Sequence, residues 1–447
     1  MKLNELKDKK VLILGFGREG KDSFLFLRKL FPDKVIGVGD KLEFKNLKLK
    51  IKNYKHVKWH LGKNYLKALK NYDVIVKSPG IPFKLLKSDF NRAKITTQTD
   101  IFFENCPGKI VGVTGTKGKS TTASIIYKIL KAGGLKVHLV GNIGKPVLNL
   151  LSSATKLSKK AKVKMRTKFS SPTPKDIYVY ELSSHQLYNL KKSPYIAVFL
   201  NIYPEHLDYY RNFKEYSQAK ANITRYQTKN DYLVYNSQDK LVKEFAKKSK
   251  AIKIPIKGKY YELDKAAARA VGEIFKVSSK VIEKALKEFK HLPHRLELVG
   301  KFKGITFYND ALSTIPETAI LAMEALGKLV QTIFLGGFDR KIDFKNLAKK
   351  VLENKNIKNL ILFPTTGEKI WQSIIKFNRG RASAELPRHF FVDNMRDAVK
   401  LAYQHTHKGK ICLLSCASTS FSIFKDYKEK GDLFKKYVKE FSHAKNL

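Results

Sequence analysis

Short apolar runs alternate with segments of helical amphipathic spacing along most of this 447-residue chain. The first runs are Lys10–Gly15, Val35–Val38 and Tyr72–Val76. Continuous runs of this kind are typical of strands buried on both faces, and their alternation with helices is typical of a parallel sheet. The same pattern restarts near residue 109 and again near residue 306. We therefore predict an α/β protein with three domains, at about 1–98, 99–297 and 298–447.

The apolar run that begins at Lys109 ends in a glycine-rich turn, within the sequence KIVGVTGTKGKSTT. Lys119, Ser120 and Thr121 then open a predicted helix, whose N-terminal N–H groups and dipole favour an anion. Lys119 adds a cation for terminal phosphates, and the Ser120 hydroxyl suits Mg²⁺. The stretch predicts a phosphate-binding loop and a central P-loop ATPase domain, although Val113 occupies the first glycine position of the general pattern GxxxxGK[ST].

A second glycine-rich turn follows the first apolar run. Gly15, Gly17 and Gly20 form a GxGxxG pattern, and the acidic Asp40 follows at about the usual distance of 20 residues. This pattern predicts a Rossmann-like domain with a nucleotide diphosphate on the helix N-terminus and Asp40 near a ribose or base. Taken alone, the unit favours a dinucleotide redox cofactor. The later turn Ser78-Pro79-Gly80 follows a strand, where a ligand-binding turn and an ordinary turn are equally compatible.

Polar residues end two further apolar runs of the central domain. Glu181 lies in the run Ile177–Leu182, and an acidic residue at a strand end beside a phosphate loop is a candidate Mg²⁺ ligand. His206 comes after the run Ala197–Ile202, a third strand of the same sheet, so a ligand is favoured over a packing histidine. Lys220 lies on a predicted helix and carries no role on pattern alone.

Two parts of the chain carry weaker signals. Residues 152–175 are rich in Ser, Lys and Pro, which predicts a surface loop, with a basic phosphate-contacting flap as the alternative. The C-terminal region has no phosphate loop of its own and is predicted to be a second Rossmann-like domain. Its expected strands lie near Thr306–Tyr308, Thr332–Gly336, Leu360–Phe363, Phe390–Val392 and Lys410–Ser415.

The chain is strongly basic, with a formal net charge of +49 from 88 Lys and Arg against 39 Asp and Glu. Such a charge is compatible with nucleic-acid binding. Because the lysines are spread over the whole chain, we favour a compositional bias together with small anionic substrates. The three cysteines (Cys106, Cys412 and Cys416) have neither metal nor disulfide spacing. Neither a membrane-spanning run nor a signal peptide is recognised, and we expect a cytoplasmic protein.

Taken together, the motifs resemble the Mur ligases, the ATP-dependent amide-forming enzymes of peptidoglycan precursor synthesis. The resemblance covers essentially the whole chain in family order. It rests on Thr114–Thr121, Gly141-Asn142-Ile143-Gly144, Glu181-Leu182-Ser183-Ser184, Asn201–His206, His294-Arg295 and Gly336-Gly337. Within the family, the D-glutamate-adding type is the most similar. The indicators are Gly15–Gly20, Ser78-Pro79-Gly80, Gly336–Phe344 and the C-terminal LLSCASTSFSIFKDYKEKGDLF.

The resemblance changes the interpretation of the first domain, which in such ligases holds the UDP of the sugar–peptide substrate. The implied substrates are ATP, UDP-N-acetylmuramoyl-L-alanine and glutamate, and the enzyme is expected to be monomeric. The substrate carboxylate takes the γ-phosphoryl group of ATP, and the glutamate amine then attacks the acyl phosphate. The implied UDP-binding residues are Gly15, Gly17, Arg18, Gly20, Asp40, Ser78, Pro79 and Gly80.

The resemblance also implies roles for the nucleotide and for two Mg²⁺ ions. Lys119 would hold the β- and γ-phosphates, and Asn142 would touch the γ-phosphate or the acyl group. Lys220 matches the family position of a carbamylated lysine, whose carbamate can bind a metal that a bare ammonium would repel. The implied metal ligands are Ser120 and Glu181 for the first ion and His206 and Lys220 for the second. The implied ATP-binding residues are Gly115, Thr116, Lys117, Gly118, Lys119, Ser120, Thr121, Arg295 and Asp310.

The third domain is expected to bind glutamate and to close onto the second domain during catalysis. The implied glutamate-binding residues are Thr314, Arg340, Ser415 and Phe421, with Arg340 pairing a carboxylate. Two departures from the family pattern affect specificity. Asp264 replaces the usual adenine-contacting Asn, and Leu312 replaces a Lys, which removes one cation from the glutamate pocket. These changes could shift the choice between D- and L-glutamate.

Three other functions remain compatible with parts of the sequence. A related ligase could use another acceptor, such as L-glutamate or a folylpolyglutamate substrate. A basic P-loop ATPase could act on nucleic acid, in which case clustered cations and aromatic residues should line a groove. A catalytically inactive scaffold is the third, and the intact Lys119, Glu181 and Lys220 argue against it.

Overall fold

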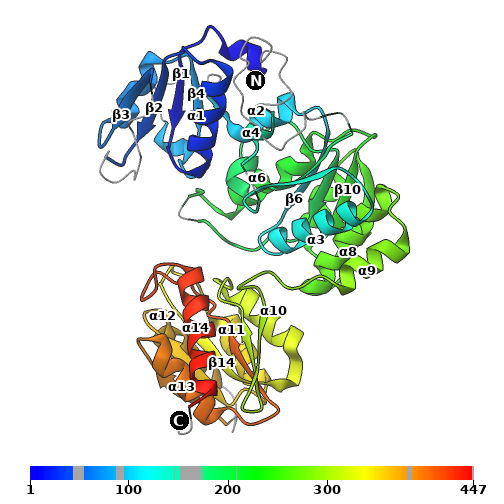
Figure 1. Cartoon of the computed structure of the whole chain (residues 1–447). Helices are drawn as coiled ribbons and strands as arrows, with labels where there is room; N and C mark the ends of the chain where they lie inside the picture. Colours follow the sequence, from blue (N-terminus) through cyan, green and yellow to red (C-terminus); the bar gives the residue numbers. More distant parts are fainter. Residues whose placement is uncertain are drawn as a thin grey trace. The chain divides into compact units, whose positions relative to one another are not determined.

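The computed structural model describes residues 1–43, 55–86, 95–144, 146–151, 173, 175–207, 209–379 and 385–444. Most of the basic segment 152–175 therefore lies outside the described residues. The chain divides into two compact units, Met1–Phe289 and Lys290–Leu447, each of which is described by itself (Figure 1). Among the helices of the described ranges, none combines the length and the apolar character needed to cross a bilayer.

The first unit begins with a five-stranded parallel sheet in the order β3-β2-β1-β4-β5, drawn in blue in Figure 1. All four residues of β1 are buried, as the continuous apolar run predicts. Because β1 lies between β2 and β4, the turn after it opens at the point where the strand order reverses, which is where such sheets bind ligands. The elements are β1 (Val11–Leu14), α1 (Arg18–Leu30), β2 (Ile36–Asp40), β3 (Val57–Leu61), β4 (Val74–Lys77), β5 (Ile95–Thr97) and α2 (Gln98–Asn105).

A second, six-stranded parallel sheet follows in the same unit, in the order β11-β10-β9-β6-β8-β7. Helix α3 packs against α8 and α9 on one side of it, and their apolar residues form one buried cluster with the central strands. The strands are β6 (Lys109–Thr114), β7 (Val137–Gly141), β8 (Ile177–Glu181), β9 (Ile196–Phe199), β10 (Tyr232–Asn236) and β11 (Ile252–Ile256). The helices are α3 (Lys119–Ala132), α4 (Leu148–Leu151), α5 (Ser184–Leu187), α6 (Phe213–Arg225), α7 (Lys240–Lys247), α8 (Tyr261–Ile274) and α9 (Ser279–Lys287).

The second unit contains a six-stranded sheet in the order β12-β13-β17-β14-β15-β16. Only the edge pair of β12 and β13 is antiparallel in this sheet. The strands are β12 (Glu297–Phe302), β13 (Ile305–Asn309), β14 (Val330–Gly336), β15 (Asn359–Phe363), β16 (Arg388–Phe391) and β17 (Ile411–Leu414). The helices are α10 (Pro316–Leu326), α11 (Lys345–Glu353), α12 (Thr366–Asn378), α13 (Met395–His405) and α14 (Tyr427–Ser442).

The predicted α/β class with parallel sheets is confirmed, and five strands were not predicted. They are β3, β5, β10, β11 and β12, and most of them are short or lie at a sheet edge. In β3 and β11 most side chains are partly or fully exposed, and β11 contains Lys253 and Pro255. Strands of this kind lack the continuous apolar run on which the prediction relied.

Candidate active site

The carboxyl ends of four neighbouring strands meet at one edge of the central sheet. In the ladder, Glu181 at the end of β8 is paired with Val113 of β6 on one side and with Gly141 of β7 on the other. Thr114 of β6 is paired with Phe199 of β9. The loops that follow these strands therefore leave the sheet at the same level, and they carry the predicted phosphate, metal and acyl residues.

The predicted phosphate loop connects β6 to α3. Gly118 is the residue before the helix and has φ +85°, a left-handed conformation that favours glycine. A Cβ there would also lie 2.4 Å from Oδ1 of Asp264. Asp264, which replaces the expected adenine-contacting Asn, is buried and accepts a hydrogen bond from Thr122 Oγ1 (2.7 Å). It therefore supports the start of α3.

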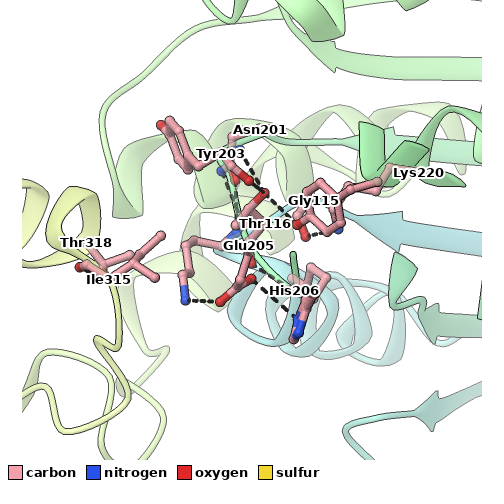
Figure 2. Close-up of polar contacts among 12 residues, drawn as sticks. Gly115, Thr116, Asn201, Tyr203, Glu205, His206, Lys220, Ile315 and Thr318 are labelled. Carbon is pink, nitrogen blue, oxygen red and sulfur yellow. Dashed lines mark hydrogen bonds and ion pairs between the residues drawn. The ribbon is translucent and has the colours of Figure 1, made fainter. Parts of the chain in front are cut away.

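The chain after β9 holds the phosphate loop in place. Thr116 N donates to Asn201 O (2.8 Å), and Lys117 N donates to Asn201 Oδ1 (2.8 Å). The Thr116 hydroxyl accepts a hydrogen bond from Tyr203 N (2.9 Å), and Figure 2 shows Asn201 and Tyr203 next to Thr116. Within the loop, Lys119 Nζ donates to Thr116 O (2.8 Å). Backbone N–H groups, a hydroxyl and a carbonyl of the loop thus take part in the hydrogen bonds that fix it.

Opposite charges are concentrated beside this loop. Lys117 Nζ lies 3.0 Å from Glu205 Oε1, and His206 Nε2 lies 3.7 Å from Glu205 Oε2 (Figure 2). Burial alone would raise the pKa of Glu205, but Lys117, His206 and Lys119 together lower it to about 2. Glu205 therefore carries a negative charge at neutral pH, and it contacts the Lys117 and His206 side chains beside the loop.

Lys220 comes from α6 and is only 2% exposed. Its ammonium donates to Gly115 O at 2.7 Å, as Figure 2 shows, and lies 5.0 Å from the centre of the Tyr216 ring. The Tyr216 hydroxyl is hydrogen-bonded to Thr116 Oγ1 (3.0 Å). Burial first, and then the positive charge of Lys119, hold the pKa of Lys220 well below its usual value.

Two of the predicted metal ligands are in direct contact. Ser120 Oγ donates to Glu181 Oε2 at 2.9 Å, and Glu181 is 3% exposed. Their hard oxygens are of the type that Mg²⁺ prefers. His206, which has the left-handed φ of +59°, is partly exposed in the loop after β9. Within the described ranges, no group of three His, Cys, Asp or Glu residues is arranged to hold a metal ion.

Most of the predicted UDP residues come together at the end of β1. Gly15 has φ +88°, and a Cβ on Gly20 would lie 1.9 Å from Gly15 O, so the turn requires both glycines. Ser78 Oγ donates to the same carbonyl (2.7 Å), and Asp40 Oδ2 accepts from Phe16 N (2.7 Å). Gly17 precedes α1, and Pro79 and Gly80 follow Ser78 after β4. Arg18 differs from this group, because its guanidinium donates to backbone carbonyls of residues 141–144.

The turn after β4 is held by residues from both sheets of the first unit. Buried Lys77 donates to Ile81 O (2.7 Å) and Ser78 O (3.0 Å). The Tyr209 hydroxyl donates to Pro79 O and Ile81 O, both at 3.1 Å. Tyr209 lies in the loop that carries His206, so one side chain joins the two candidate substrate loops.

The remaining predicted residues belong to the second unit. Buried Asp310 accepts hydrogen bonds from Ser415 Oγ (3.0 Å) and Leu296 N (3.0 Å), and burial raises its pKa to about 6. Arg295 precedes Leu296 and its charge counteracts that rise. The other three predicted residues lie in loops of the same unit: Thr314 is half-buried, whereas Arg340 and Phe421 are exposed.

Buried donors in the loop after β17, and the buried ammonium of Lys430 on the neighbouring α14, lack oxygen or nitrogen partners among the described residues. The hydroxyls of Thr419, Ser420 and Ser422 have no hydrogen-bond partner among the described residues. The ammonium of Lys430, which is 1% exposed, has no oxygen or nitrogen acceptor among them either. Donor hydroxyls in this loop, with the Lys430 ammonium of α14 against Cys416, fit an anionic ligand with several acceptor oxygens.

Sequence reasoning assigned no role to several residues that shape these sites. Glu205, Tyr209 and Tyr216 were not assigned, and neither was Lys430. Glu205 directly precedes a predicted ligand, so its position in a strand-end loop was a usable signal. The others act through partners that are distant in sequence, and no local pattern marks them.

Comparisons with known proteins were made for the whole chain. Residues 113–309 match the family model described as the Mur ligase middle domain. The chain is 32% identical to the UDP-N-acetylmuramoylalanine--D-glutamate ligase of Acetivibrio thermocellus, with 98% of each chain covered. It is 31% identical to the protein of the same name from Clostridium tetani, again over 98% of each. The MurF ligase structure from Thermotoga maritima in complex with ADP has a TM-score of 0.54 at 18% identity, covering 84% of this chain and 91% of that one.

Proposed function

Because this chain belongs to the Mur ligase family, and within it to the D-glutamate-adding ligases, we propose that it joins D-glutamate to UDP-N-acetylmuramoyl-L-alanine at the expense of ATP. The substrate carboxylate attacks the γ-phosphorus, ADP leaves, and the glutamate amine displaces phosphate from the acyl phosphate. The observation that carries the proposal is the assembly of Lys119, Ser120, Glu181 and Lys220 around one phosphate loop.

Different residues at the edge of the central sheet bind the phosphates and orient the reacting groups. Lys119 and the N–H groups at the start of α3 bind the β- and γ-phosphates and stabilise the negative charge that develops there. Asn142, exposed on the turn after β7, orients the γ-phosphate or the acyl group. Asp264 supports α3 in place of the usual Asn, so the contacts to adenine depend on other residues.

The oxygen ligands fit Mg²⁺, which would neutralise phosphate charge when bound. Ser120 and Glu181 would hold one ion, and His206 with a carbamylated Lys220 would hold a second. The burial of Lys220 supports the carbamate, because a buried lysine that loses its proton can react with CO₂. The carbamate would add an anionic ligand to His206, since the described His, Cys, Asp and Glu residues form no group of three that could hold a metal ion.

The other two substrates are assigned to the remaining sites. The turns at Gly15–Gly20 and Ser78–Gly80, with Asp40, hold the uridine diphosphate. Arg295 and Asp310 would contact ATP from the second unit. Thr314, Arg340, Ser415 and Phe421 would bind glutamate, and the unsatisfied donors of the loop after β17 support a dicarboxylate there. We also retain the domain division at about 1–98, 99–297 and 298–447 as substrate, nucleotide and acceptor domains.

The decisive experiment is phosphate release from ATP with UDP-N-acetylmuramoyl-L-alanine, with D-glutamate and L-glutamate added in separate reactions. Release that requires both the UDP substrate and D-glutamate is expected. Release with L-glutamate but not with D-glutamate would still identify a ligase. It would attribute the different acceptor specificity to the glutamate pocket, where Leu312 replaces a Lys. The nucleic-acid alternative, which rested on the net charge of +49, is not favoured by the relatives. Release that responds only to nucleic acid would contradict the proposal.

A further inference from the structure

The Arg18 guanidinium donates hydrogen bonds to the backbone at the end of a strand in the second sheet of its unit. Arg18 lies at the start of α1, beside the turn that is proposed to hold UDP. Its Nη2 donates to Gly141 O at 2.7 Å and to Gly144 O at 3.0 Å, and its Nη1 donates to Asn142 O at 3.2 Å. Three of the five guanidinium N–H groups are therefore directed at one short turn of the central sheet.

The geometry of that turn explains why its carbonyls gather on one side. Gly141 and Gly144 have φ +100° and +85°, and such left-handed residues turn their carbonyls away from the usual direction. The turn also lies tightly against the next strand, because a Cβ on Gly141 would be 2.4 Å from Glu181 O. The only backbone hydrogen bond from Asn142 N to that strand is long, at 3.5 Å to Glu181 O. The guanidinium therefore supplies three polar contacts that hold this turn from outside the sheet.

The start of α1 is itself fixed to the central sheet. Glu19 Oε1 accepts from Gln186 Nε2 at 2.7 Å, and Gln186 lies on α5, just after Glu181. Asp22 Oδ2 accepts from Gln98 Nε2 (2.7 Å) and from Leu148 N (3.2 Å). A side chain that extends from this helix start therefore has a rigid base, and the position of its guanidinium is defined.

We propose that Arg18 is a positioning residue, which holds the turn Gly141–Gly144, and with it Asn142, in register beside Glu181. The role assigned to Asn142 rests on the proposed function, whereas the restraint on the turn does not. The sequence resemblance instead implied that Arg18 binds UDP. Lysine cannot replace this arginine, because a single ammonium cannot reach three carbonyls in a fixed planar arrangement.

The first test needs no substrate. Backbone hydrogen exchange of the segment Leu139–Gly144 is measured in the ligand-free full-length chain, for the wild type and for Arg18→Lys and Arg18→Gln. Both variants are expected to exchange faster in this segment, while the core strand β6 keeps its protection. The matched control is Lys21→Gln, which removes a positive charge from the same helix and should leave the segment unchanged. Unchanged exchange in both Arg18 variants would overturn the proposal.

The second test separates positioning from UDP binding. For Arg18→Lys we expect kcat to fall by between about tenfold and a hundredfold, because a small displacement of a reacting group has effects of this size. KM for the UDP substrate should stay within about twofold. A raised KM with unchanged kcat would assign Arg18 to UDP and overturn the proposal. If the chain proved not to be this ligase, the exchange measurement would still decide whether Arg18 holds the turn.

Discussion

The edge of the central sheet and the loop after β17 in the second unit both carry predicted substrate residues, but they satisfy their polar groups differently. At the central edge, Ser120 is hydrogen-bonded to Glu181 and Lys220 is hydrogen-bonded to Gly115 O. In the loop after β17, the Ser420 hydroxyl is buried and has no hydrogen-bond partner among the described residues. A buried polar group without a partner costs about 1–3 kcal/mol of folding stability.

This difference determines what a ligand must do in each place. At the central edge, a ligand replaces interactions that already exist between protein groups, so the site is ordered before binding. In the loop after β17, a ligand rich in acceptor oxygens supplies partners that the protein lacks. Removing a side chain should therefore have opposite effects on stability in the two regions, although both removals impair the proposed function.

Ser120→Ala tests the central edge and should have the largest effect. The variant removes the donor to Glu181 Oε2, an oxygen of a residue that is 3% exposed. We expect the free energy of unfolding to fall by about 1–3 kcal/mol. Activity should fall by roughly a hundredfold, because charge stabilisation around the phosphates is lost. The measurements are the thermal unfolding midpoint of the ligand-free chain and the rate of phosphate release.

The control for this prediction is Ser120→Thr, which keeps the hydroxyl that phosphate loops use. It should retain most of the stability and of the activity. A Ser120→Ala variant as stable as the wild type would mean that the central edge gains nothing from its internal pairs, and the contrast between the two regions would be lost.

Features that are encoded in a short stretch of sequence could be predicted. The glycine-rich turns at Gly15 and Gly118 were recognised because their left-handed φ values and the helix that follows are encoded locally. The contact of Ser120 with Glu181 also involves residues of local motifs, because Ser120 lies at the start of the helix after β6 and Glu181 ends β8, the strand beside β6. Lys220 was placed by family resemblance alone, since nothing on its helix indicates that it reaches the phosphate loop.

Other features depend on partners far apart in sequence and could not be predicted. The hydrogen bonds of Tyr209 to Pro79 O and Ile81 O join residues about 130 positions apart. Lys430 lies on an amphipathic helix whose pattern does not reveal that its ammonium is buried without an oxygen or nitrogen acceptor among the described residues. The edge strands β3 and β11 escaped prediction because exposure removes the apolar run that marks a buried strand.

Glu19 extends the comparison to the first unit, where its buried Oε2 has no hydrogen-bond partner among the described residues. Burial raises its pKa from 4.5 to about 7, against the lowering effects of Gln186, Arg18 and Lys77, while Asp22 raises it further. Below pH 4.5 the side chain is protonated in both states. Between pH 4.5 and 7 the unfolded chain releases the proton first, so the wild type loses stability as the pH rises.

Glu19→Gln should remove this loss. Relative to the wild type, its free energy of unfolding is expected to rise across that range by at most about 3 kcal/mol, and then to level off. The measurement is the thermal unfolding midpoint of both proteins as a function of pH. Glu273→Gln, at an exposed position of α8, should show no such trend. A difference between Glu19→Gln and the wild type that does not change with pH would show that the folded chain does not retain the Glu19 proton.

Ser420→Ala tests the loop after β17 and should have the smallest effect. Removing a buried hydroxyl without a partner should stabilise the ligand-free chain by about 1 kcal/mol, which corresponds to roughly 2–4 °C in the unfolding midpoint for a unit of this size. KM for glutamate should rise, and KM for ATP should not change.

The matched variant is Ser418→Ala in the same loop, whose hydroxyl is hydrogen-bonded to Thr366 Oγ1 at 2.7 Å. That variant should lower stability. If both variants lowered the unfolding midpoint equally, the Ser420 hydroxyl would have a partner in the ligand-free protein. Buried polar groups would then be paired in both regions, and the difference between them would disappear.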